Sequence, residues 1–136
     1  MKMEFTTFDI VKLFNIPRSN VQQYIDRGLL TPSFERTQGR GSKNRFSFND
    51  LYRFNLFQKL YVVGLSQREA SENSCLVDFR KIADEGDSWL RVVRDKSKIK
   101  IVFTNEEAIK SELHSADIFI ALNIQRIKEE VDALAS

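Results

Sequence analysis

Residues 16–32 read Ile-Pro-Arg-Ser-Asn-Val-Gln-Gln-Tyr-Ile-Asp-Arg-Gly-Leu-Leu-Thr-Pro, and this stretch decides which fold the sequence predicts. Val21, Tyr24 and Ile25 recur at spacings of three and four residues, as along one face of a helix, and their neighbours are polar. Ser19 can cap the start of this helix, and Gly28 can close it in a left-handed conformation. The stretch therefore predicts a short helix with one apolar face and one polar face.

A second short helix is predicted just before it. Thr6 or Thr7 can cap a helix over residues 8–14, where apolar side chains recur with helical spacing, and Asn15 and Pro17 would end it. About four residues would then separate the two helices, which is the spacing of a helix-turn-helix.

A basic, glycine-rich segment follows the two helices. Residues 36–45 read Arg-Thr-Gln-Gly-Arg-Gly-Ser-Lys-Asn-Arg and contain no acid. Phe34 and the Phe-Ser-Phe alternation of residues 46–48 predict two short strands that flank this loop. A recognition-sized helix followed by a basic loop is the order of a winged helix-turn-helix, in which the helix enters a DNA groove and the wing lies along phosphates.

Two more helices are predicted after the wing. Asn49 or Ser47 can cap a third helix over residues 50–63, which Gly64 would end. Ser66 and Glu69 have the spacing of a capping box and predict a fourth helix.

The middle of the chain has weaker signals. Residues 75–85 predict a helix, with Cys75 as a buried thiol. Residues 89–94 and 99–103 predict a β-hairpin around a charged turn. Thr104 and Glu107 form a further capping-box pattern, from which we expect a helix to run nearly to residue 136, either unbroken or broken near residue 114.

The last predicted helix has a heptad seam. Its apolar side chains are spaced by four and three residues, and charged side chains lie off the seam. This pattern favours a dimerising coiled coil, although a helix that packs on its own domain gives the same spacing. The predicted dimerisation residues are Leu113, Ile120, Ile124, Ile127, Val131 and Leu134.

Charge and composition narrow the function. Residues 1–60 contain ten Lys/Arg and five Asp/Glu, a balance of +5, whereas residues 61–136 have a balance of −3. A basic first half suits a polyanion such as nucleic acid. No apolar run reaches the roughly 18 residues that span a bilayer, and an acid interrupts the N-terminal residues where a signal peptide would be apolar, so we expect a cytoplasmic protein.

No catalytic or metal-binding pattern is evident. The single cysteine excludes an intrachain disulfide and a cysteine metal cluster, and His114 is the one histidine. Neither a catalytic constellation nor a phosphate-binding glycine motif can be assembled. We therefore expect no enzyme activity, no cofactor and no metal.

The order of these parts resembles the MerR family of bacterial transcription regulators over residues 5 to about 72. The matching segments are residues 5–10 (Phe-Thr-Thr-Phe-Asp-Ile), 24–32, 44–51 and 60–66. The resemblance implies a mainly α fold: a DNA-binding winged helix-turn-helix over residues 1–72, and a dimerisation helix over residues 113–136 that forms an antiparallel coiled coil. Between them, residues 73–112 would hold a linker helix and a small central β-hairpin of unknown role.

The resemblance also implies a function. A homodimer would bind a pseudo-palindromic promoter element in double-stranded DNA, with RNA polymerase as a further partner. No cysteine pair accompanies the predicted coiled coil, which argues against metal or redox sensing by cysteines. Trp89, Val93, Ile101 and Phe103 could line an effector pocket, but a hairpin that covers the helices is the simpler account.

Side-chain chemistry then selects the candidate DNA contacts. Asn and Gln can pair with adenine and Arg with guanine, which suits the polar face of the second helix, whereas the cations of the wing suit phosphates. Tyr24 can contact a phosphate or simply pack. The predicted DNA-binding residues are Arg18, Asn20, Gln22, Gln23, Tyr24, Arg36, Arg40, Lys43, Arg45 and Arg53.

Two other functions stay open. An architectural DNA-binding protein without an effector, such as a phage excisionase or a chromosome-anchoring protein, can use the same winged fold. A protein-interaction module that has lost DNA binding is the other option, because Gln22 and Gln23 stand where the family usually has arginine followed by an aromatic residue.

Overall fold

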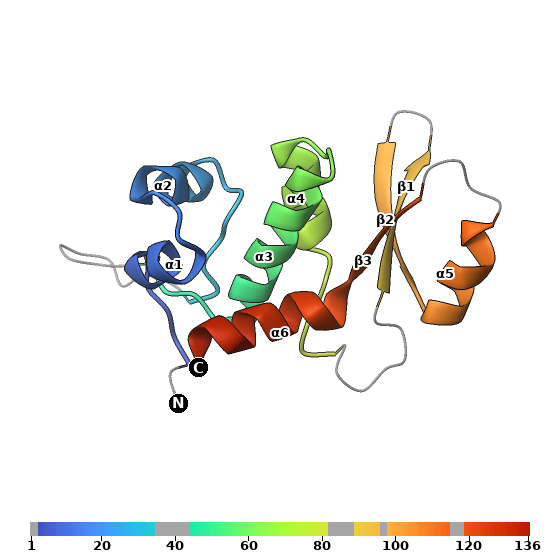
Figure 1. Cartoon of the computed structure of the whole chain (residues 1–136). Coiled ribbons are helices and arrows are strands. Elements are labelled where there is room, and N and C mark those ends of the chain that lie inside the picture. Colours follow the sequence, from blue (N-terminus) through green and yellow to red (C-terminus); the bar gives the residue numbers. More distant parts are fainter. Residues whose placement is uncertain (1–2, 35–43, 82–88, 96–97, 115–118) are drawn as a thin grey trace.

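The computed structural model describes residues 3–34, 44–81, 89–95, 98–114 and 119–136. The fold is mainly helical with one small antiparallel sheet, as the sequence predicts (Figure 1). In chain order its elements are α1 (Thr7–Phe14), α2 (Arg18–Asp26), α3 (Phe48–Val62), α4 (Gln67–Ser74), β1 (Trp89–Asp95), β2 (Lys98–Thr104), α5 (Glu106–Leu113), β3 (Ile120–Asn123) and α6 (Ile124–Ala135).

Helix α1 begins and ends as predicted. Thr6 is its N-cap and forms a capping box with Asp9, in which the Thr6 amide donates to Asp9 Oδ2 over 2.8 Å. Asn15 ends the helix in the left-handed conformation, with φ of 52°. Asparagine tolerates this conformation better than most residues, so the chain can turn at once toward α2.

Helix α2 begins one residue earlier than its predicted cap. Pro17, rather than Ser19, is the N-cap, and its carbonyl accepts hydrogen bonds from the amides of Asn20 and Val21. The proline ring fixes φ near the helical value, so the helix can start directly after it. Gly28 has φ of 71° and ends this segment as predicted.

Helix α3 is the central helix and packs against α4 and α6 (Figure 1). Ser47 caps it, and Asp50 completes the capping box, so the helix starts at Phe48 and not at Asp50. Gly64 follows with φ of 113°, which lets the chain reverse into α4. The predicted capping box of Ser66 and Glu69 at the start of α4 is confirmed.

The predicted β-hairpin is confirmed, and it has a third strand. The strand order is β2-β1-β3, with both neighbours antiparallel to β1. Leu90 of β1 is fully buried, whereas the next residue, Arg91, points to the opposite face and pairs with Glu112 of α5 over 2.8 Å. The sheet therefore lies between the helices of the N-terminal half and α5 (Figure 1).

Helix α6 returns from the sheet and lies along α3 (Figure 1). The buried Asn55 of α3 donates to the carbonyl of Ile127 over 2.9 Å and to Glu130 Oε2 over 3.1 Å. Tyr52 of α3 donates to Asp132 over 2.5 Å, and burial together with this carboxylate raises the pKa of Tyr52. Hydrogen bonds from side chains of α3 thus fix the rotation of α6 about its axis and its position along α3.

The predicted heptad seam is not one helical stripe. Ile124, Ile127 and Val131 lie in α6 and are buried in the core of their own chain, next to α3. Ile120 lies in β3, where it pairs with Val92, so the prediction of helix at this position is wrong. Pairing with β1 overrides the helical spacing there. Leu113 ends α5 instead, and Leu134 of α6 is half exposed.

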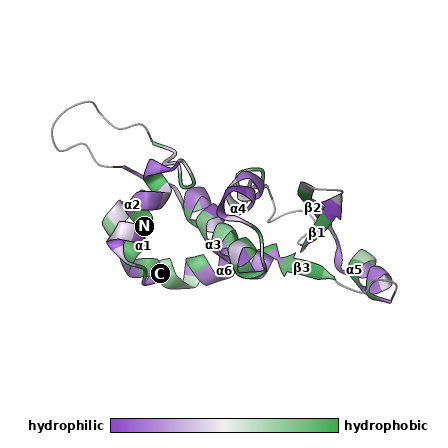
Figure 2. Cartoon of the chain, turned by 90° about the horizontal axis from the view of Figure 1, so that it is seen from above, coloured by the Kyte–Doolittle hydropathy of each residue, from purple (hydrophilic) through white to green (hydrophobic). Residues whose placement is uncertain are grey.

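Figure 2 colours the chain by hydropathy. Strand β3 is hydrophobic, whereas α4 is largely hydrophilic on the side seen there. The core runs continuously from Phe5 and Ile10 through α3 to Leu90 and Leu122 of the sheet. Residues 1–72, 73–112 and 113–136, which were predicted as separate segments, therefore contribute to one core in this structure.

The predicted helix over residues 75–85 is wrong in its described part, residues 75–81, which form turns. Val77 and Phe79 are fully buried, and the Phe79 amide donates to Asn49 Oδ1 over 2.9 Å, so side chains of α3 hold this segment. Cys75 is exposed and not buried, because it is the C-cap of α4 and its neighbour Ser74 faces the core.

One further cap differs from its prediction. Asn105, and not Thr104, caps α5, since Asn105 Oδ1 accepts from the amide of Ala108 over 2.9 Å. The chain is still in strand β2 at Thr104. In the described ranges, none of the helices combines the length and the apolar character that crossing a bilayer would require.

Candidate nucleic-acid interface

Helix α2 exposes most of its polar side chains. Val21 is its one fully buried residue, and the side chains of Tyr24 and Ile25 are half buried against the core. The predicted base-contacting residues all lie on the exposed part of this helix: Arg18, Asn20, Gln22 and Gln23. The apolar positions thus hold the helix on the domain, and the polar positions remain available to a partner.

An acid joins this polar face. Gln22 Nε2 donates to Asp26 Oδ1 over 2.9 Å, one turn further along α2. The bond orients the Gln22 amide, and the Asp26 carboxylate can accept from the amino group of cytosine but repels phosphate. The exposed face of α2 is therefore chemically suited to base edges more than to the DNA backbone.

Tyr24 packs within the domain. Its ring centroid lies 5.3 Å from that of Phe57 and 6.0 Å from that of Phe54, both in α3. Such tilted ring contacts stabilise the docking of α2 on α3. Of the two roles predicted for Tyr24, the structure shows packing. A contact between its hydroxyl and a phosphate stays a prediction.

Asp50 holds the two ends of the basic segment together. Its Oδ2 accepts from the amides of Ser33, over 2.9 Å, and Ser47, over 2.8 Å, and its Oδ1 accepts from Ser33 Oγ over 2.6 Å. Asp50 is only 4% exposed. Phe34 and Arg45 then form an isolated antiparallel bridge, so the flanking strands predicted here are reduced to single bridges. We call Ser33, Phe34, Arg45, Ser47 and Asp50 the wing base.

Of the four predicted wing cations, only Arg45 lies in the described residues; Arg36, Arg40 and Lys43 lie outside them. Arg45 is half exposed and pairs with Glu4 over 3.3 Å. An exposed pair of this kind contributes little to stability, so the Arg45 guanidinium can exchange Glu4 for a phosphate at small cost.

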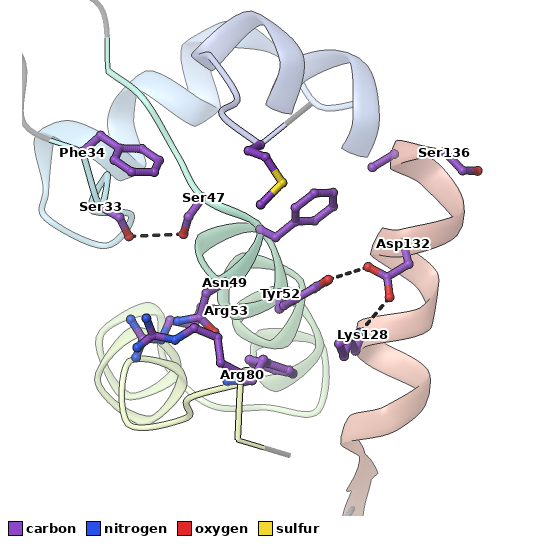
Figure 3. A pocket seen from close by; sticks show the side chains of 14 residues that line it. Ser33, Phe34, Ser47, Asn49, Tyr52, Arg53, Arg80, Lys128, Asp132 and Ser136 are labelled. Atoms are coloured by element: carbon purple, nitrogen blue, oxygen red, sulfur yellow. Dashed lines mark hydrogen bonds and ion pairs between the residues drawn. The ribbon is translucent and has the colours of Figure 1, made fainter. Parts of the chain in front are cut away.

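Arg53 is placed apart from α2. Its Nε donates to the carbonyl of Val77 over 2.8 Å, in the turn segment after α4. This bond fixes the guanidinium beside the wing base, where it lines a cavity together with Ser33 and Phe34 (Figure 3). If Arg53 contacts a phosphate as predicted, it does so from beside the wing base and not from α2.

Two residues of this region were missed from the sequence. Asp50 is the last residue of a Ser-x-x-Asp capping box, three positions after Ser47, and that spacing was the available signal. Asp26 has the i, i+4 spacing to Gln22 that favours a side-chain pair on a helix. Among the described residues, no group of three or more His, Cys, Asp or Glu is placed to hold a metal ion.

Comparison with known proteins bears on the same residues. A family model described as "MerR HTH family regulatory protein" matches residues 5–73, about half of the chain. No curated protein matches the sequence. The matched part comprises α1, α2, the wing base, α3 and nearly all of α4. With its helix-turn-helix, its wing base and this match, the chain belongs to the MerR HTH family of regulatory proteins.

Proposed function

We propose that this protein is a sequence-specific DNA-binding transcription regulator that acts in the cytoplasm as a homodimer on a pseudo-palindromic promoter element. The observation that carries the proposal is the exposed polar face of α2, which is anchored through Val21 and backed by α3. Asn, Gln and Arg side chains, which this face presents together, are the ones that can form paired hydrogen bonds with adenine and guanine edges.

In this proposal α2 enters the major groove. Gln22, Gln23 and Asn20 contact adenine edges through pairs of hydrogen bonds, and Arg18 contacts guanine. Asp26 orients Gln22, as their 2.9 Å hydrogen bond allows, and selects cytosine where its carboxylate reaches an amino group. A helix of nine residues reads only a few base pairs.

The wing supplies the contacts that do not depend on sequence. Arg36, Arg40, Lys43 and Arg45 bind phosphates on either side of the groove. Because Asp50 accepts hydrogen bonds from the amides of both Ser33 and Ser47, the described ends of the basic segment lie at one place, next to Arg45. Support for this role comes from the charge of the segment and from the position of its two ends.

Two copies are part of the proposal because one short helix cannot select a unique site in a genome. Two half-sites double the number of base pairs that are read. If the halves contribute equally, the ratio of specific to non-specific affinity is squared. Ile124, Ile127 and Val131 already pack inside one chain, so a dimer has to use other apolar side chains, among which Leu134 and Leu113 are half exposed. Sedimentation equilibrium at micromolar concentration tests the dimer directly.

The decisive test of DNA binding is a charge reversal in the wing, Arg40→Glu with Arg45→Glu. A matched control is Lys100→Glu with Lys110→Glu, which changes the net charge equally but lies in β2 and α5, far from α2 (Figure 1). In a gel-shift titration on DNA from upstream of its own gene, we expect the wing variant to lose at least 100-fold in affinity and the control to lose less than fivefold. Equal losses, or activity in vivo that survives the wing change, would refute the proposal.

A further inference from the structure

A large cavity lies between the wing base and α6. It has a volume of about 1010 Å³, at the upper end of the roughly 300–1,000 Å³ typical of small-molecule sites. Its walls come from the start of α3, from residues 79–80, from Met3 and from the last turns of α6 (Figure 3). It is separate from the exposed face of α2, none of whose residues lines it.

One wall is aromatic. The ring centroids of Phe48 and Tyr52 lie 5.9 Å apart, and those of Tyr52 and the fully buried Phe79 lie 5.4 Å apart, so Phe79 supports this wall from the core side. Phe34 of the wing base adds a fourth ring. Such a surface accepts a flat apolar body by ring stacking and edge contacts.

The charged side chains of the lining are mostly cationic. Among the described residues, the lining has three cationic side chains and one acidic side chain: Arg53, Arg80, Lys128 and Asp132. The Asp132 carboxylate already accepts hydrogen bonds from the Lys128 ammonium, over 2.9 Å, and from the Tyr52 hydroxyl. Arg80 in turn makes two hydrogen bonds to Asp78, over 2.9 and 3.1 Å. Lys128 and Arg80 are therefore largely neutralised by their own partners.

Arg53 is the exception. Its Nε is held by the carbonyl of Val77, which fixes the plane of the guanidinium, while its two terminal nitrogens have no hydrogen-bond partner in the part of the chain that the structure describes. A fixed guanidinium with a free pair of N–H groups is the donor that binds a carboxylate through two parallel hydrogen bonds.

We propose that this cavity binds a small molecule with a flat aromatic body and a carboxylate group. The body lies against Phe48 and Tyr52, with the buried Phe79 ring behind Tyr52, and the carboxylate is held by Arg53. This site adds a ligand to the proposed function and does not depend on it, since neither the ring wall nor Arg53 belongs to the exposed face of α2.

The test is a screen of aromatic fragments by protein-observed NMR, with equal numbers of carboxylates, neutral amides and amines built on benzene, naphthalene and indole rings. We expect hits to be mainly carboxylates and to shift the signals of residues 33–34, 48–53 and 128–135. Equal hit rates for the three charge classes, or no hits, would overturn the proposal.

Two variants connect the hits to the cavity. Ala135→Phe fills it without removing a hydrogen bond, and its matched control, Ala133→Phe, adds the same ring at an exposed position outside the cavity. Arg53→Lys keeps the charge but loses the two-pronged donor. We expect Ala135→Phe to abolish binding, Arg53→Lys to weaken it about tenfold and Ala133→Phe to leave it unchanged.

The same variants distinguish a second copy of the chain as the occupant. In that case the wild type would associate with rising concentration, Ala135→Phe would be monomeric, and fragments would not bind. That result would refute a ligand site. Because no DNA is present in these experiments, their failure is distinct from a failure of DNA binding.

Discussion

At the scale of single residues, Asp50 connects the two described ends of the basic segment. One buried carboxylate receives two backbone amides and one hydroxyl, and these groups come from both ends of the basic segment. Its contribution goes beyond capping α3, because without it Ser33 and Ser47 would lose their common partner.

We expect Asp50→Ala to destabilise the protein by about 3 kcal/mol, since it removes charge-assisted hydrogen bonds and leaves buried amides unpaired. The comparison is Ser66→Ala, which removes one exposed cap of α4 and should cost about 1 kcal/mol. Urea unfolding followed by circular dichroism measures both. Equal effects of the two substitutions would mean that Asp50 acts as an ordinary helix cap.

Residues of α2 were the most predictable part of the candidate site. Their apolar and polar positions follow a local 3.6-residue period, so the sequence alone indicates that Val21 points inward and Gln22 outward. Asp50 and Arg53 were not predictable in the same way. Their partners Ser33 and Val77 are 17 and 24 residues away in sequence, and only the fold brings them together.

At the scale of elements, α6 is the clearest case of a pattern with two physical meanings. A seam of Ile and Val with heptad spacing can face another chain or the chain's own core, and in this structure it faces α3. The buried Asn55 supports this packing, because its amide donates to the carbonyl of Ile127.

Ile127→Ala should therefore destabilise the monomer itself, by about 3 kcal/mol, through the cavity that it leaves. Leu134→Ala, at a half-exposed position of the same helix, should cost about 0.5 kcal/mol or less. Thermal unfolding at several protein concentrations measures both. Similar costs for the two variants, with melting temperatures that rise with concentration, would show that the seam belongs to a coiled coil.

The tie between α3 and α6 also predicts a pH dependence. The hydrogen bond from Asn55, followed by the Lys59 ammonium, lowers the pKa of Glu130 from its ordinary value. A lowered pKa in the folded state means that the ionised carboxylate stabilises the fold above the ordinary pKa of 4.5 and that this contribution disappears as the pH falls through the folded value.

We expect Glu130→Gln to cost about 0.5 kcal/mol at neutral pH, a small effect because the side chain is half exposed, and nothing near pH 3. The control is Glu129→Gln, which removes the same charge from the same helix at a side chain bonded to Gln125 of that helix. Urea unfolding across this pH range is the measurement. A constant difference between Glu130→Gln and wild type would contradict the assignment.

Elements with strong local signals were predicted well, and those that depend on distant partners were not. The capping boxes of α1 and α4 and the hairpin of β1 and β2 rest on neighbours in sequence. Strand β3 has four residues whose spacing also fits a helix, and it is a strand because β1 offers an unpaired edge. Residues 75–81 likewise follow contacts made by α3.

At the scale of the whole molecule, the proposed DNA face and the aromatic cavity meet at the wing base. Ser33 and Phe34 on one side of the basic segment, and Ser47 on the other, line the cavity and also bracket the wing cations (Figure 3). A ligand that contacts both ends can change DNA affinity only if it binds the DNA-bound and free forms unequally, and DNA then changes ligand affinity by the same factor.

The central claim is that the polar face of α2 reads DNA sequence. The most direct test is selection from a pool of random-sequence duplexes by the wild type and by the double variant Gln22→Ala with Gln23→Ala, followed by sequencing. The account predicts that the wild type enriches one defined element with two symmetric halves, whereas the variant still binds DNA at low salt but no longer enriches that element. Failure of the wild type to enrich any sequence, or enrichment of the same element by the variant, would contradict it.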